Sequence, residues 1–106
     1  MGIENMHLLV DPESQTIRKE AVSRYIVEEE RFKYVFGWDQ PLQSFYLQVH
    51  DNKIIDPDNN PVHWLGADSE TRMYEVEALC RAAETHGLYI NYNVRLMLYS
   101  DKDDGR

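Results

Sequence analysis

Apolar residues recur at helical spacing between residues 69 and 86. With an advance of about 100° per residue they gather within an arc of about 120°, so one side of the segment is apolar. This side carries Met73, Val76, Leu79, Cys80 and Ala83, whereas Glu70, Glu77, Arg81 and Thr85 lie on the other side. Asp68 is a good N-cap residue and Gly87 suits a left-handed C-cap. The pattern predicts a helix over residues 69–86 that lies on a core.

A second stretch, residues 16–28, also fits a helix. Half of its helical wheel carries Ile17, Ala21, Val22, Tyr25 and Ile26. Arg18 intrudes into this face and Val27 lies outside it, but the alternating pattern of a strand matches these residues less well. We therefore expect a helix at about residues 16–28.

The segment between these two helices alternates with the period of a strand. In residues 31–36 and 43–50, aromatic and aliphatic side chains occupy every second position. The link at residues 37–41 contains Gly37 and Pro41 and predicts a hairpin turn. A further short strand is expected at residues 62–65, after the turn-rich residues 56–61.

These elements define an α+β fold. We expect a small antiparallel sheet of three to four strands, a meander from about residue 31 to 65, packed against two helices at about 16–28 and 69–86. A chain of 106 residues with 42% apolar and 11% aromatic residues suits one globular domain over 1–106.

The last apolar segment, residues 88–99, permits two interpretations. Alternation through Ile90, Tyr92, Val94, Leu96 and Leu98 favours a strand that returns to the sheet. The alternative is a short helix capped by Asn93, since leucine, methionine and arginine are good helix formers. In either case we expect residues 101–106 to fray.

Charge and the N-terminal sequence limit the function classes. The net charge of −8 argues against a nucleic-acid binder that neutralises phosphates. Residues 1–10 lack the pattern of a secretory signal, Met6 stands where a myristoylation motif needs serine or threonine, and the apolar runs are too short for a membrane span. We expect a cytoplasmic protein without membrane contact.

Two histidines raise the question of a metal site. His50 and His63 lie near the ends of two expected neighbouring strands, and with Asp39, Asp51 or Asp56 they could form the His/His/carboxylate set of a small metal-dependent hydrolase. Surface or hydrogen-bonded histidines are the preferred interpretation, because no HExxH or other metal-ligand motif is present.

Other chemistry has less support, and no cofactor is expected. Residues 56–61 superficially resemble a calcium loop, but Pro61 and Ala67 replace the required glycine and glutamate, so we expect a solvated turn. Cys80 lies on the apolar helix face and is expected to be core. His86 suits the C-terminal end of a helix dipole.

The hairpin turn provides the best binding candidate. Trp38, followed by Asp39 and Gln40, must either fold back onto the core or contact a partner, whereas Trp64 is expected to be core. The favoured function is a protein-binding or self-associating module without catalytic activity, with a protein partner or homo-oligomer contacting Trp38, Asp39 and Gln40. The alternatives are the hydrolase and an acidic inhibitor that imitates DNA.

Overall fold

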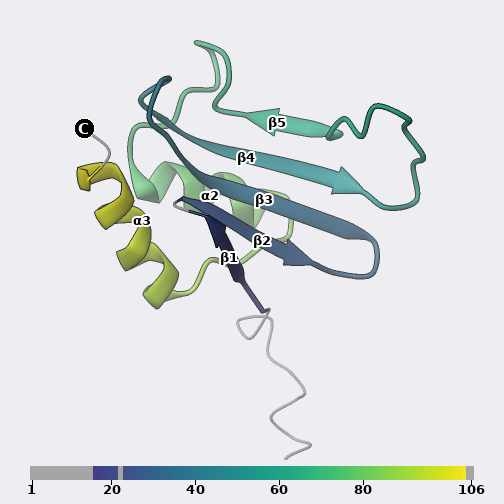
Figure 1. The fold of residues 1–106 in the computed structure, drawn as a ribbon, viewed down its shortest axis with the longest axis horizontal. Coiled ribbons are helices and arrows are strands. Elements are labelled where there is room, and N and C mark those ends of the chain that lie inside the picture. The colour runs from purple at the N-terminus through teal and green to yellow at the C-terminus, as the bar shows by residue number, and fades with distance from the viewer. Residues whose placement is uncertain (1–15, 22, 105–106) are drawn as a thin grey trace, which may run out of the picture.

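A computed structural model describes residues 16–21 and 23–104. The elements are β1 (Arg18–Ala21), β2 (Arg24–Glu28), β3 (Phe32–Asp39), β4 (Ser44–Asp51), β5 (His63–Leu65), α2 (Val76–Thr85) and α3 (Tyr92–Asp104). The five strands form one antiparallel sheet in sequence order, a simple meander (Figure 1). The expected α+β class and the meander are confirmed.

The helices and the sheet share one core. In Figure 1, α2 lies behind the sheet and α3 beside it. Alternate strand residues point toward the helices, because successive side chains of a strand face opposite sides. The core includes Tyr25, Val27, Tyr34, Phe36, Trp38, Phe45, Leu47 and Val49 from the sheet, with Val76, Leu79, Cys80, Ala83, Val94 and Leu98 from the helices.

The prediction of a helix over residues 16–28 is wrong, because β1 and β2 occupy this stretch. Ser23 has a φ of 57°, which breaks any helix between them. In β2, Tyr25, Ile26 and Val27 are all buried, so the alternation that marks a strand is lost. A strand buried on both faces is an apolar run, and such a run also fits one side of a helix. Val22 lies outside the described residues.

The helix expected over residues 69–86 is shorter, since α2 begins at Val76. The Asp68 carboxylate accepts hydrogen bonds from the N–H groups of Glu70 and Thr71 at 3.1 and 2.9 Å, which folds this segment into a turn. Met73 then bridges to β4, where its carbonyl accepts a 2.8 Å bond from the Phe45 N–H. The chain therefore pairs with β4 at Met73 before α2 begins.

The last segment is helical, so the favoured strand is wrong and the alternative helix is correct. Its N-terminus is capped by Asn91 rather than Asn93: the Asn91 side-chain oxygen accepts a 3.0 Å bond from the Val94 N–H. The helix continues to Asp104 instead of fraying at residue 101, because Asp101 accepts a 2.7 Å bond from the Tyr25 hydroxyl. Residues 105–106 lie outside the described part.

Over the described ranges, neither helix is long and apolar enough to cross a membrane. Residues 1–10, where a secretory signal or lipid anchor would lie, are outside those ranges.

Candidate binding site on the open sheet face

No helix within residues 16–21 and 23–104 covers the sheet face opposite α2, which we call the open face. One row of cross-strand partners on this face crosses all five strands: Arg18, Ile26, Val35, Gln48 and Trp64. Ile26 and Val35, in the middle of this row, are buried, whereas Arg18 and Trp64 at its ends are exposed. The exposed aromatic surface of the row therefore lies on the edge strand β5.

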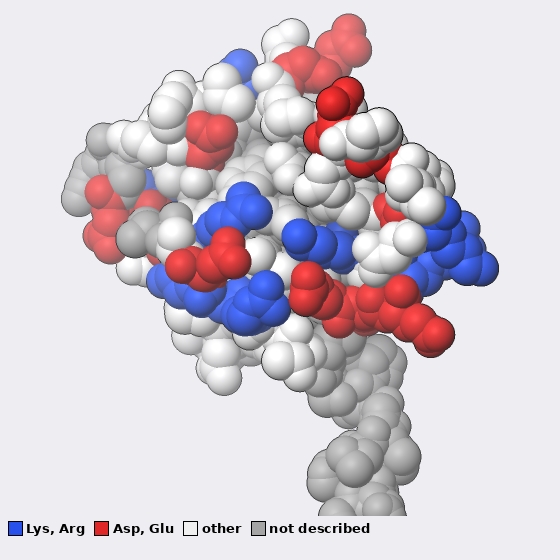
Figure 2. Space-filling view, turned by 45° about the vertical axis from the view of Figure 1, so that its right-hand side comes forward, with Lys and Arg blue, Asp and Glu red and all other residues white. Residues whose placement is uncertain are grey.

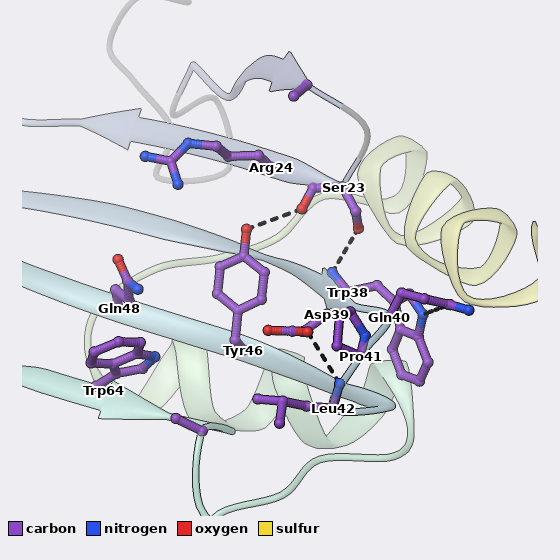
Figure 3. Close-up of a pocket in the computed structure, with 12 residues that line it drawn as sticks. Ser23, Arg24, Trp38, Asp39, Gln40, Pro41, Leu42, Tyr46, Gln48 and Trp64 are labelled. Carbon is purple, nitrogen blue, oxygen red and sulfur yellow. Dashed lines mark hydrogen bonds between the residues drawn. The ribbon is translucent and has the colours of Figure 1, made fainter. Parts of the chain in front are cut away.

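The open face is hollowed beside Trp64. The hollow, which we call the Trp64 pocket, has a volume of about 430 Å³. It is lined by Ala21, Ser23, Arg24, Trp38, Asp39, Gln40, Pro41, Leu42, Tyr46, Gln48, Trp64 and Ala67 (Figure 3). The β1–β2 turn, the β3–β4 turn and the middle of β4 and β5 thus contribute to one concave surface.

Tyr46 stands in the centre of this pocket. It pairs with Gly37 on β3, and its hydroxyl donates a 3.0 Å hydrogen bond to the Ser23 carbonyl, as Figure 3 shows. A Cβ on Gly37 would lie 1.9 Å from that carbonyl oxygen and 3.1 Å from the Tyr46 hydroxyl. The glycine therefore creates the space in which the β1–β2 turn and the tyrosine ring meet.

The charges around Tyr46 have both signs. Burial raises the pKa of the Tyr46 phenol, while Arg24 and Asp39 act on it in opposite directions. Arg24 forms an exposed ion pair with Glu20, with Nε 2.9 Å from the carboxylate. Exposed pairs of this kind contribute little, so Arg24 can exchange this partner at low cost.

Trp38, Asp39 and Gln40, the residues expected at a binding turn, all line the pocket. The Trp38 ring has folded back onto the core: its exposed fraction is 8%, and it meets Phe45 edge to face with centroids 4.9 Å apart. Its indole N–H lies 3.4 Å from the Gln40 side-chain oxygen. Asp39 accepts a 3.2 Å bond from the Leu42 N–H, which shapes the turn. These contacts make Trp38 a wall of the pocket.

Trp64 was expected in the core, and this prediction is wrong, because 53% of its surface is exposed. In the register of β4 and β5, Leu65 pairs with the buried Leu47 while Trp64 pairs with Gln48 on the open face. Because neighbouring side chains of a strand face opposite sides, a Leu65 that packs against the core places Trp64 on the open face. The sequence did not show this, because Val62 and Leu65, which lie close to Trp64, are both apolar.

The two histidines of the hypothetical hydrolase are not brought together. His63 pairs with Val49, and His50 pairs with Lys33, so the two imidazoles lie on opposite faces of the sheet. Burial, with Lys33 and Arg24 nearby, lowers the pKa of His50. Across the described ranges no three histidine, cysteine, aspartate or glutamate side chains gather as a metal site.

His63 instead lies beside His86, at the C-terminal end of α2. The ring centroids are 4.5 Å apart and the rings are inclined by 40°. Burial and the neighbouring His63 lower the pKa of His86.

The two remaining candidates, Cys80 and the loop at residues 56–61, have structural roles in the core and in a turn. Cys80 is buried, and burial raises the pKa of its thiol, which disfavours the nucleophilic thiolate. In the loop resembling a calcium site, Asp56 accepts a 2.9 Å bond from the Asp58 N–H, and Asn59 adopts a φ of 58°. Both features are typical of a tight turn.

Acidic and basic side chains alternate over the surface in Figure 2. On β1 and β2, Arg18 lies 3.6 Å from the Glu28 carboxylate, and Arg24 is paired with Glu20. A DNA mimic needs rows of acids at phosphate spacing, so the mixed charge visible in Figure 2 does not favour this alternative.

Comparison of the chain with protein-family models, curated proteins and solved structures finds no match.

Proposed function

We propose that this chain is a protein-binding module without catalytic activity and that the Trp64 pocket is its binding surface. The observation that carries the proposal is the exposure of Trp64 beside Tyr46 and Arg24. Tryptophan, tyrosine and arginine are the residue types that most often dominate binding energy at protein interfaces. Here all three line the same hollow.

The proposed occupant is an extended segment of a partner protein. Its apolar side chain would cover the exposed face of Trp64, and burial of that surface would supply affinity. Because Arg24 and Asp39 place charges of opposite sign around Tyr46, the segment would carry both an acidic and a basic residue. The Glu20 carboxylate, now paired with Arg24, would be displaced by the acidic group of the partner.

Two features of the pocket favour binding with little rearrangement. The Tyr46 hydroxyl is fixed by Ser23, and the Trp38 ring is held against Phe45. A surface that is already ordered loses less conformational entropy when it binds.

A displayed library of random peptides, selected against the purified chain, tests the proposal. We expect selected peptides to combine an apolar residue with charges of both signs. Trp64→Ala should weaken their binding by about tenfold or more, because truncation of a hot-spot residue costs about 2 kcal/mol. Tyr74→Ala is the matched control, since Tyr74 is 55% exposed and lies outside the pocket.

Peptides that bind the Trp64→Ala variant as tightly as the unchanged chain would overturn the proposal. Sedimentation of the chain alone tests whether a second copy of the chain occupies the pocket. A dimer that Trp64→Ala dissociates and Tyr74→Ala leaves intact would identify a second copy, rather than a foreign segment, as the occupant.

A further inference from the structure

A second surface, on the helix-covered side of the sheet, brings two imidazoles together. His63 comes from the edge strand β5 and His86 follows the last residue of α2, so 22 positions of sequence separate them. Their ring centroids are nevertheless only 4.5 Å apart. Both rings reach the surface, since His63 is exposed and His86 is half-buried.

The backbone on both sides of this pair is well anchored. The His86 N–H donates to the carbonyls of Ala82 and Ala83 at 3.3 and 3.0 Å, and its own carbonyl accepts a 2.9 Å bond from the Tyr34 hydroxyl. His63 is held by its pairing with Val49 on β4. The two imidazoles therefore project from ordered backbone, so no backbone segment has to be ordered when both bind one ion.

We propose that His63 and His86 form a two-histidine binding site for a late divalent transition-metal ion such as Cu²⁺ or Ni²⁺. An imidazole nitrogen binds such an ion at about 2.0–2.1 Å, and the ring centre lies about 1.2 Å beyond the nitrogen. Two rings that bind one ion at angles between right-angle and tetrahedral coordination then have centroids about 4.5–5.3 Å apart. The observed separation of 4.5 Å lies within the range that one shared ion requires.

Neutral imidazole, the main form of an ordinary histidine at pH 7, supplies the lone pair that such a bond needs. Because the described ranges hold no cluster of three or more metal-ligating side chains, water would fill the remaining positions on the ion. A site of this kind is open on one side and binds more weakly than a closed structural centre.

An ion at this site would also connect two elements of the fold. His63 and His86 belong to different elements, so an ion bound to both would tie β5 to the end of α2. Binding that exists only in the folded chain stabilises it, because the unfolded chain offers no preformed pair.

Titration of metal-stripped protein with NiCl₂ or CuCl₂, followed by calorimetry, tests the site. We expect one ion per chain and a rise in the thermal unfolding midpoint. His63→Gln and His86→Gln should each weaken binding by about tenfold or more and remove the thermal shift, because one imidazole cannot chelate.

The other described histidine provides a matched control. His50→Gln removes an imidazole on the open face, so this variant should bind like the unchanged chain. Urea unfolding without metal shows whether each variant folds. The proposal is overturned if the chain shows no saturable binding, or if His63→Gln and His86→Gln, folded, bind as the unchanged chain does.

Discussion

The Tyr46 hydroxyl crosses β3 to bind the backbone carbonyl of Ser23 at 3.0 Å. Gly37 lies beneath this contact and pairs with Tyr46 across the strands. Ser23 also accepts a 2.6 Å hydrogen bond from the Trp38 N–H through its hydroxyl. The β1–β2 turn is thus fastened to both β3 and β4, and the Trp64 pocket forms beside this junction.

Gly37→Ala should destabilise the chain strongly. The added Cβ would lie 1.9 Å from the Ser23 carbonyl oxygen and 2.6 Å from its carbonyl carbon, and these backbone atoms cannot move aside as a flexible side chain can. Overpacking of this kind costs about 1–3 kcal/mol, and we expect the upper end of this range. Urea unfolding of the variant and the unchanged chain measures the difference.

Tyr46→Phe separates this steric effect from the hydrogen bond. It keeps the ring and removes only the donor to Ser23, so the expected loss is about 1 kcal/mol. If Gly37→Ala proved no more destabilising than Tyr46→Phe, the close approach at Gly37 would not be the constraint inferred here.

Two leucines on α3 should differ sharply on truncation. Leu98 is fully buried against the sheet, and Leu98→Ala should cost about 2–5 kcal/mol through lost burial and a residual cavity. Leu96 is 47% exposed, and Leu96→Ala should change the free energy of unfolding by less than about 0.5 kcal/mol. Equal effects in chemical denaturation would contradict the packing of α3 through Leu98.

Stability should fall in alkaline solution through Tyr25. Burial, together with the hydrogen bond to Asp101, raises the pKa of the Tyr25 phenol in the folded chain. This contribution to stability is complete below the pKa of the unfolded residue, near about 10, and is lost as the pH rises toward the higher folded value.

Tyr25→Phe removes that titration. The stability difference between the unchanged chain and Tyr25→Phe should therefore shrink as the pH rises above about 10. Denaturation at several alkaline pH values measures the trend, and a difference that stays constant would exclude this role for Tyr25.

The two tryptophans should respond differently to a soluble quencher of fluorescence. Trp64 is 53% exposed and Trp38 only 8%, so acrylamide should quench the Trp64 emission much more efficiently. Trp64→Phe should leave a poorly quenched protein, and Trp38→Phe, where it folds, a readily quenched one. More efficient quenching of Trp38 than of Trp64 would contradict the exposure of Trp64 and the burial of Trp38.

The sequence pattern predicted the centre of the fold better than its two ends. In β3 and β4 one face is core and the other is partly polar, so alternation was visible in the sequence. In β2 the side chains on both faces are buried, and the consecutive apolar residues Tyr25, Ile26 and Val27 hide the period that distinguishes a strand from a helix. In residues 88–99 the apolar residues alternate as in a strand, but the segment forms α3. Helix propensity and packing against the sheet, which an alternating pattern does not report, favour the helix.

The candidate site was only partly predictable. Trp38, Asp39 and Gln40 were predicted as a binding turn because turn residues flank an aromatic side chain, and all three line the pocket. The exposure of Trp64 depends on the register between β4 and β5, where a shift by one residue would exchange the faces. The contact of His63 with His86 joins distant elements and has no local signal in the sequence.

The edges of the sheet restrict how it can meet other chains. At one edge, β1 is exposed along its whole length, carries Arg18, Lys19 and Glu20, and is interrupted by a register shift after Lys19. At the other edge, β5 has only three residues. Charged, irregular and short edges resist the addition of further strands, which is the first step of sheet-to-sheet aggregation. An aromatic surface can thus stay open to solvent on a protein whose sheet does not readily grow.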